Sequence, residues 1–484
     1  MSSHTDSAAP SSDAPMPSSP AAVPSSPAAS SPMPASTPPP TPPPASSRDM
    51  LHQLISMAIP TFGQLIAEPT FILIDTAIVG HVNDSALAGL SVGSTVILTT
   101  VGLCVFLAYG TTSRVAHLMG AGRRRDGFEE GISGLWLALA IGVIVATVIG
   151  FIARPLCSFL GARDSVLDNA TAYLLAMIGG IPGALLVYAC NGILRGLERT
   201  RLTLLAAVAG AVVNTILDVG MVIGLGWGIV GSGVATLIAQ WTTCLIMLVP
   251  TLRWARESGA RLRPRREGIL RSAGDGGPLF IRTLALRCAL VGTVMLAARM
   301  GDHVLAAYQS VNAVWNFVLN MLDAIGISGQ ALVALQLGAG HRPQARRAVS
   351  TASRAGLAAG AVIAIGMMAL ACLASPLFSP NPDIVRLIAI GMMVQAVFLP
   401  LAGWMWALDG ILIGAQDYRY LAVTCTITAL VYLPALGLVS MADRNPGMDD
   451  TLHMIILWML INVLFIGPRA IFNGMRIRGD RWMH

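Results

Sequence analysis

Charged residues are scarce in this chain of 484 residues, and lysine is absent. Only 12% of the residues are charged, about half the fraction that a soluble domain carries, whereas 54% are hydrophobic and the mean hydropathy is +0.68. The net charge of +6 therefore comes from arginine alone. Because the arginines lie in short loops between apolar segments, and not together on a soluble domain, we predict no binding to nucleic acid.

Sequence motifs of soluble enzymes are also missing. The chain has no GxxxxGK[ST] loop that would cradle the phosphates of ATP, and no HExxH motif. Its seven cysteines form no CxxC pair and its eight histidines are dispersed, so the sequence indicates no metal-dependent enzyme. We predict that the protein is not an enzyme and needs no cofactor.

Apolar residues occur instead in long blocks. Leu135–Ile152 runs for eighteen residues without a charge, close to the roughly 20 residues that a helix needs to cross a bilayer. The strands of outer-membrane barrels alternate in polarity, unlike these blocks. We therefore predict an all-α integral membrane protein with about twelve transmembrane helices. The spans are expected near residues 51–77, 86–116, 131–154, 167–194, 202–224, 229–252, 276–298, 303–336, 346–374, 384–412, 419–440 and 450–472.

The ends of the chain and its loops indicate how these helices are oriented. Residues 1–47 are rich in Ser, Pro and Ala and hold too few large apolar side chains for a core, so we expect a disordered tail. Loops that carry arginine, such as 123–125 and 253–271, alternate with loops that carry acids, such as 449–450. The positive-inside rule assigns the arginine-rich loops and both termini to the cytoplasmic side of the plasma membrane.

An internal repeat divides the chain into two halves. A shift of 218 residues without gaps places Leu87-Ala88 on Leu305-Ala306, Gly120-Ala121-Gly122 on Gly338-Ala339-Gly340, and Gly192-Ile193-Leu194 on Gly410-Ile411-Leu412. Each half holds six spans, so both insert in the same orientation, as two pseudo-symmetric six-helix bundles that face a central cleft. We predict an N-lobe at 48–252, a basic linker at 253–275, a C-lobe at 276–475 and a C-terminal tail at 476–484.

Ionisable side chains inside the spans are costly to insert and therefore need a reason. The acids are Glu68, Asp75, Asp218, Asp323 and Asp409, and the basic candidates to pair with them are Arg282 and Arg287. Glu68 and Asp75 lie seven residues apart and share one face of the first span. Pro60 and Pro69 interrupt the same span, and a proline allows a helix to kink.

A second polar group lies on two later spans. Asn214 and Asp218 are four residues apart and share a face of the fifth span, and Thr236 lies on the sixth. Such side chains often tie helices together, and this structural role stays open for Asn214 and Thr236. The acids of the first half have few basic partners there. Because burial disfavours the charged form of a carboxyl group, these acids are suited to take up a proton or a cation.

The second half departs from this pattern. No acid occupies the positions that the repeat makes equivalent to Asp75 and Asp218, and the seventh span carries two arginines. Two interpretations stay open for Asp323 and Asp409. They form a buried ion pair with these arginines, or they take a direct part in coupling or substrate contact.

Three segments that hold these residues resemble a known family. Ile74-Asp75-Thr76-Ala77-Ile78-Val79-Gly80-His81 is similar to a segment of the multidrug and toxic compound extrusion (MATE) transporters, particularly of their DinF-like branch, and so are residues 214–218 and 408–415. The resemblance extends from about residue 50 to residue 475. It implies two pseudo-symmetric lobes that form a V. It also implies export of amphipathic, often cationic compounds in exchange for protons or sodium ions.

The resemblance also assigns roles to residues. The family's N-lobe cation site, for a proton or Na⁺, falls here on Asp75, Asn214, Asp218 and Thr236, and its first-helix proline, implicated in bending, falls on Pro60. Members with a C-lobe cation site have an acid on the seventh span, where this chain has arginines. The resemblance therefore favours the N-lobe site over a C-lobe sodium site.

We predict a secondary active multidrug efflux transporter that works by alternating access, as a monomer surrounded by membrane lipid, with small amphipathic or cationic molecules as substrates. The main alternative is a lipid-linked saccharide flippase of a related two-lobed family, which should line its cleft with several cationic residues for pyrophosphate. A membrane-embedded enzyme would need a clustered nucleophile and base, or a metal site. Among the ionisable side chains singled out above, five are acids and two are arginines, which favours the antiporter.

Overall fold

The computed structural model describes residues 46–80, 84–373, 375–442 and 449–483. Residues 1–44 and 45–484 form separate units. The disordered tail that the sequence predicts at residues 1–47 lies almost wholly outside the described residues and stays a prediction.

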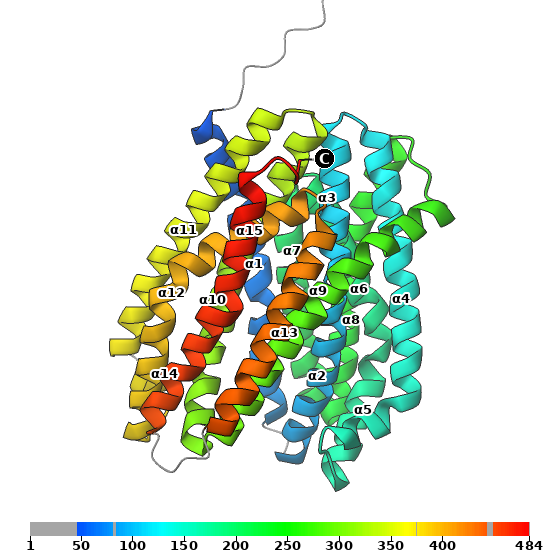
Figure 1. Ribbon diagram of the computed structural model, residues 1–484. Coiled ribbons are helices and arrows are strands. Elements are labelled where there is room, and N and C mark those ends of the chain that lie inside the picture. Colours follow the sequence, from blue (N-terminus) through cyan, green and yellow to red (C-terminus); the bar gives the residue numbers. More distant parts are fainter. Residues whose placement is uncertain (1–45, 81–83, 374, 443–448, 484) are drawn as a thin grey trace, which may run out of the picture. The chain divides into compact units, whose positions relative to one another are not determined.

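Helices account for every regular element in the described part of the chain, which confirms the all-α class (Figure 1). The first lobe contains α1 (Ser47–Gly80), α2 (Asp84–Leu103), α3 (Phe106–Gly120), α4 (Arg124–Phe159), α5 (Asp164–Met177), α6 (Ile181–Gly196), α7 (Thr200–Asp218) and α8 (Gly228–Glu257). The second lobe contains α9 (Arg266–Arg299), α10 (Asp302–Gly338), α11 (Arg342–Leu373), α12 (Pro382–Gly414), α13 (Tyr418–Ala442), α14 (Asp450–Leu460) and α15 (Gly467–Arg478). Four short turns are 3₁₀ or π-helical: η1 (Ile178–Gly180), η2 (Val219–Gly224), η3 (Ser375–Leu377) and η4 (Ile461–Ile466).

Most of these helices are long enough to cross a membrane. Eleven continuous helical stretches of the described residues have the length and the apolar composition of a membrane span. Helix α1 is a further helix of 34 residues, longer than the roughly 20 residues that a bilayer requires. The chain is therefore a multi-pass membrane protein, in agreement with the predicted number of about twelve spans.

Several predicted spans are interrupted. The span expected at 86–116 consists of α2 and α3, with a turn at Cys104 and Val105 between them. The span expected at 167–194 changes from α5 through η1 to α6, where Pro182 occupies the first turn, the position at which its missing N–H costs nothing. The expected linker at 253–275 also contains the end of α8 and the start of α9. Hydropathy marks only the part of a helix that lies in the bilayer, so the predicted limits of the lobes and the linker stay predictions.

The sequence repeat is also present in the helix packing. In the first lobe, α4 and α6 approach so closely that a Cβ added to Gly142 would lie 2.6 Å from the Cα of Pro182. In the second lobe, a Cβ added to Gly360 would lie 2.9 Å from the Cα of Pro400. Both residues of the second contact stand 218 positions after those of the first. Only glycine permits these approaches, so the two lobes use the same contact between their helices.

The two lobes meet through a reciprocal contact of α3 with α10. Gly120 of α3 packs on the carbonyl group of Leu335, and Gly338 of α10 packs on the carbonyl group of His117. A shift of 218 residues converts Gly120 into Gly338 and His117 into Leu335. The lobes are therefore related by a pseudo-two-fold arrangement at the point where they touch.

Polar contacts reinforce this lobe interface. Gln330 of α10 donates through Nε2 to the carbonyl oxygen of Tyr109 at 2.8 Å and to Ser113 Oγ at 2.9 Å. Arg114 of α3 forms an ion pair with Asp275 of α9, which joins one lobe to the other. These contacts lie at the end of α3 and α10 that leads into arginine-rich loops, so the lobes are closed together at that end.

Candidate cation-coupling site

Two buried acids lie together in the first lobe. Asp75 is on α1, and Asp218 is the last residue of α7, directly before the π-helical turn η2. The two residues are 5% and 0% exposed, and their carboxyl groups are close enough to interact. Helices α1 and α7 pack against each other, which brings these acids of two separate spans to one place.

Helix α8 adds two hydroxyl groups to the acid pair. Ser232 Oγ donates to Asp75 Oδ1 at 2.6 Å, and Thr236 Oγ1 accepts a hydrogen bond from Asn214 Nδ2 at 3.3 Å. Ser232, Thr236 and Asn214 are all buried. Residues four apart share one face of a helix, so α8 presents both hydroxyl groups to α1 and α7. The structure thus brings together the four residues proposed from the sequence and adds Ser232.

Three acceptor oxygens in this cluster have no donor. Among the described residues, no N–H or O–H group reaches Asn214 Oδ1 or either carboxyl oxygen of Asp218. Buried acceptors without a partner are costly, and a buried carboxylate without a partner is more costly still. A proton shared with Asp75, or a small cation, would satisfy these oxygens.

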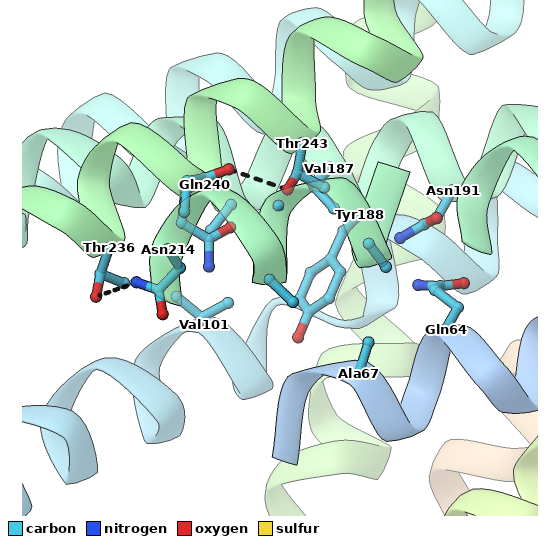
Figure 2. A pocket seen from close by; sticks show the side chains of 15 residues that line it. Gln64, Ala67, Val101, Val187, Tyr188, Asn191, Asn214, Thr236, Gln240 and Thr243 are labelled. Atoms are coloured by element: carbon cyan, nitrogen blue, oxygen red, sulfur yellow. Dashed lines mark hydrogen bonds between the residues drawn. The ribbon is translucent and has the colours of Figure 1, made fainter. Parts of the chain in front are cut away.

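Two small cavities lie beside this cluster. The first has a volume of about 90 Å³, and its lining combines apolar side chains with polar ones that include Gln64, Asn191 and Thr236 (Figure 2). The second, of about 50 Å³, is lined by Asp75, Tyr173 and Thr236 among others. Because Thr236 lines both, the cavities are neighbours. One water molecule occupies about 30 Å³ of liquid volume, so each cavity is of a size for a small ion or a few water molecules.

The accessory residues predicted on α1 are only partly described. The helix continues through Pro60 and Pro69, and Pro60 is buried. The side chain of Glu68 lies outside the described residues, and its role stays a prediction. The bending role that the resemblance assigned to Pro60 also stays a prediction.

In the second lobe, Asp409 of α12 has several partners. Arg282 of α9 donates through Nη2 to Asp409 Oδ2 at 2.5 Å, Arg469 of α15 donates to the same oxygen, and Asn473 Nδ2 donates to Oδ1 at 2.5 Å. Arg469 also lies 5.1 Å from the ring centroid of Trp406. All four polar side chains are buried. The arrangement is that of a structural ion-pair network.

Two of these partners are absent from the sequence prediction. Arg469 and Asn473 lie at the end of the last expected span, 450–472, and just after it, where the charge pattern assigns Arg469 to the cytoplasmic end. Arg469 is 2% exposed and lies inside the lobe, and the side of the membrane that it faces stays a prediction. Hydropathy cannot find an arginine of this kind, because its charge is compensated only by a residue 60 positions earlier.

Asp323 and Arg287 lie outside this network. Asp323 of α10 accepts a long hydrogen bond of 3.4 Å from the hydroxyl group of Tyr109, across the lobe interface. Arg195 of α6 donates to Gln64 Oε1 at 3.0 Å nearby in the first lobe. Arg287 is exposed, and its guanidinium group lies near Gly102 of α2. Of the two arginines of the seventh span, the one that pairs with Asp409 is therefore Arg282.

A comparison with known protein families finds the same twofold organisation. The MatE family model matches this chain at residues 60–219 and again at residues 278–436. The chain belongs to the MATE family. The second match begins 218 residues after the first, which is the offset of the internal repeat.

Individual MATE relatives cover most of the chain. It is 29% identical to Protein DETOXIFICATION 44, chloroplastic, of Arabidopsis thaliana over 413 residues, which is 80% of this chain and 77% of the relative. It is 27% identical to DNA damage-inducible protein F of Escherichia coli (strain K12) over 394 residues, 79% of this chain and 85% of the relative. The crystal structure of the Vibrio cholerae MATE transporter VcmN in the bent form matches with a TM-score of 0.80 at 19% identity, over 90% of this chain and 99% of VcmN. The two-lobed fold is thus confirmed, and the protein is a membrane transporter of the MATE family.

The two lobes of this MATE transporter differ in polarity at matching positions. The repeat places Asp75 on Thr293 and Asn214 on Tyr432. In the second lobe these two residues are buried, and their hydroxyl groups are hydrogen-bonded to each other at 2.8 Å. The counterpart of the acid site is therefore neutral and internally satisfied.

The polarity is exchanged at a second pair of positions. The repeat places Gln64 on Arg282 and Asn191 on Asp409. The two amides line the first cavity of the N-lobe, whereas their counterparts form a buried ion pair in the C-lobe. Each lobe of the MATE fold thus carries charge where the other lobe is neutral.

Proposed function

We propose that this MATE transporter exports amphipathic or cationic compounds in exchange for an inward-moving cation, a proton or Na⁺. The observation that carries the proposal is the buried pair of Asp75 and Asp218, in which neither carboxyl oxygen of Asp218 has a donor among the described residues. Asn214 and Thr236 complete the proposed site. Such a site is costly when empty and ionised, and it is stabilised when a cation enters.

Cation binding has to change the equilibrium between lobe conformations, which requires different affinities in the two conformations. Helix α1 is suited to this role because it carries Asp75 and also packs on α10 of the other lobe. The rings of Phe62 and Phe317 meet there edge to face, with their centroids 6.2 Å apart. A change in α1 at the acid pair therefore reaches the lobe interface. Pro60 and Pro69 are the points where α1 bends most easily.

The energy available from protons is sufficient for export. Two pH units of inward gradient supply about 2.7 kcal/mol per proton. If one proton enters for each substrate molecule exported, this free energy supports a ratio of about 100 between the substrate concentrations on the two sides of the membrane. The transporter would need no cofactor beyond the coupling ion.

We also propose that the arginine-rich loops and both termini face the cytoplasm, and that the transporter acts as a monomer in the plasma membrane. The arginines at residues 123–125 and 342–347, at the starts of α4 and α11, support this orientation through the positive-inside rule. Labelling of single cysteines placed in these loops, with a reagent that does not cross membranes, tests the orientation.

Transport by purified protein in lipid vesicles tests the coupling. We expect Asp75→Asn to reduce dye transport driven by an imposed proton or sodium gradient at least tenfold. Asp168→Asn is the matched control, because Asp168 is an exposed acid of the same lobe, paired with Arg154 at the surface. Full gradient-driven transport by Asp75→Asn would show that the proposed coupling is wrong.

The saccharide flippase remains the alternative function. It needs arginines that are free to bind pyrophosphate inside the cleft. Arg282 and Arg469 are engaged with Asp409, which favours the antiporter. Flux of a lipid-linked saccharide in the same vesicles distinguishes the two functions.

A further inference from the structure

Ser232 is a buried residue that the family resemblance did not bring into the cation site. It lies on α8, is 0% exposed, and its hydroxyl group donates to Asp75 Oδ1 at 2.6 Å. Hydrogen bonds to a carboxylate are shorter and stronger than those between neutral groups, and this contact has such a length. Ser232 therefore fixes the orientation of the Asp75 carboxyl group.

The glycines on either side of Ser232 explain why the contact exists. A Cβ at Gly231 would lie 3.1 Å from backbone and side-chain atoms of Met221 in the π-helical turn η2. A Cβ at Gly233 would lie 2.7 Å from the Cβ of Ala176 on α5. Without these two side chains, α8 approaches η2 and α5 closely enough to place Ser232 against Asp75. The sequence Gly231-Ser232-Gly233, which reads as simple close packing, thus delivers a hydroxyl group to the site.

The second lobe shows that this contact is not a general feature of the fold. The offset of 218 residues relates the lobes over the two matched ranges, residues 60–219 and 278–436. It places Asp75 on Thr293, which is bonded to Tyr432 instead. The hydroxyl–carboxyl contact at Asp75 therefore has no counterpart at Thr293, where the second lobe has a contact between two hydroxyl groups.

We propose that Ser232 is a positioning residue of the cation site, which holds Asp75 Oδ1 so that the other carboxyl oxygen is available to Asp218 and to the coupling cation. This inference rests on the proposed coupling function. Asp218 on α7 is the charged group that faces Asp75, and Tyr173 on α5 is the neighbouring phenol. The hydroxyl group of Thr236 lies one turn further along α8. Loss of the Ser232 hydroxyl frees the Asp75 carboxyl to rotate and weakens cation binding, while the substrate path is unchanged.

The test compares Ser232→Ala with Thr251→Ala in lipid vesicles. Thr251 is a matched control because it is also buried on α8, and its hydroxyl group bonds only to the carbonyl oxygen of Met247 in the same helix. Dye transport is measured against Na⁺ concentration at fixed pH, and against proton concentration without Na⁺. For Ser232→Ala we expect a tenfold higher cation concentration at half-maximal rate, equivalent to about 1.4 kcal/mol, and a maximal rate within twofold of the wild type. Thr251→Ala should keep both values, and Ser232→Thr, which retains a hydroxyl group, should keep the half-maximal concentration within threefold.

Each other result has a definite meaning. The positioning role is overturned if Ser232→Ala has the wild-type cation concentration at half-maximal rate for both Na⁺ and protons. It is also overturned if Thr251→Ala changes this concentration as much as Ser232→Ala does. Asp75→Asn is measured in the same series to separate this failure from failure of the proposed function. If Asp75→Asn abolishes coupling while Ser232→Ala behaves as wild type, only the role of Ser232 is wrong. If Asp75→Asn retains full coupling, the proposed function itself is wrong.

Discussion

The two lobes should respond oppositely to the same chemical change, the replacement of a buried aspartate by asparagine. Asp409 is the counter-ion of Arg282 and Arg469, and all three residues are at most 9% exposed. Removal of one partner from a buried ion pair leaves uncompensated charge and costs about 3–5 kcal/mol. We therefore expect Asp409→Asn to lower the free energy of unfolding by this amount.

Asp218 has the opposite surroundings. No donor of the described residues reaches its carboxyl oxygens, and the charged group that faces it is the carboxyl group of Asp75. Replacement of Asp218 by asparagine removes a like charge and adds an N–H donor beside Asp75. The free energy of unfolding should therefore stay unchanged or rise, while the coupling of transport to the cation is lost. Such a gain in stability at the expense of function is common when a functional site is altered.

Thermal unfolding of the detergent-purified variants at neutral pH measures both effects. The unfolding temperature should fall for Asp409→Asn and should be equal to or above the wild-type value for Asp218→Asn. The double variant Asp409→Asn with Arg469→Met is the control, because it removes a cation together with its partner and should recover part of the loss. If the two single variants lower the unfolding temperature equally, the reasoning is refuted. The charge of Asp409 would then not be balanced any better than the charges of Asp75 and Asp218.

Two further predictions concern the lobe interface and the neutral site of the second lobe. Asp275→Asn breaks the ion pair of Arg114 that joins the lobes. Because both side chains are partly exposed, the interaction between the lobes should lose about 0.5–1 kcal/mol. This loss corresponds to a two- to fivefold increase in the population of transporters whose lobes are separated at this end of α3 and α10. Distances between spin labels placed at residues 123–125 and 342–347, at the starts of α4 and α11, measure this population. An unchanged distance distribution would contradict the prediction. Tyr432→Phe removes the hydroxyl group that bonds Thr293, and it should leave the half-maximal cation concentration of vesicle transport within twofold. A tenfold change would instead reveal a second cation site in that lobe.

Much of the architecture follows from the sequence because it depends on long-range averages. Blocks such as Leu135–Ile152 predict a span whatever their neighbours are, and the constant offset of 218 residues predicts the paired lobes. The i, i+4 spacing of Asn214 and Asp218 also predicts a shared helix face correctly. These features are local or periodic, so the chain alone contains them.

Other features depend on contacts between distant helices. Ser232 reads as one small residue in a glycine-rich stretch, and only the packing of α8 against α1 shows its bond to Asp75. The ion pair of Arg469 is also missed by the sequence, because its partner Asp409 lies on another helix. The π-helical turn η2 after Asp218 has no sequence signal of its own, since the residues of Val219–Gly224 are ordinary span residues.

Each lobe carries charged side chains at positions where the other lobe is neutral. This difference suits a duplicated fold in which the proposed cation site lies in one lobe. Charge inside a span is costly unless it is compensated or functional. In the second lobe Asp409 is compensated by two arginines, so it has little to gain from a cation and serves packing. In the first lobe, Asn191 stands at the position equivalent to Asp409 and lines a cavity, while Asp75 and Asn214 stand at the positions where the second lobe has the hydrogen-bonded pair of Thr293 and Tyr432. Under the proposed coupling, a cation would be stabilised strongly in the first lobe and hardly at all in the second. This difference would allow cation binding to favour one relative arrangement of the lobes over another.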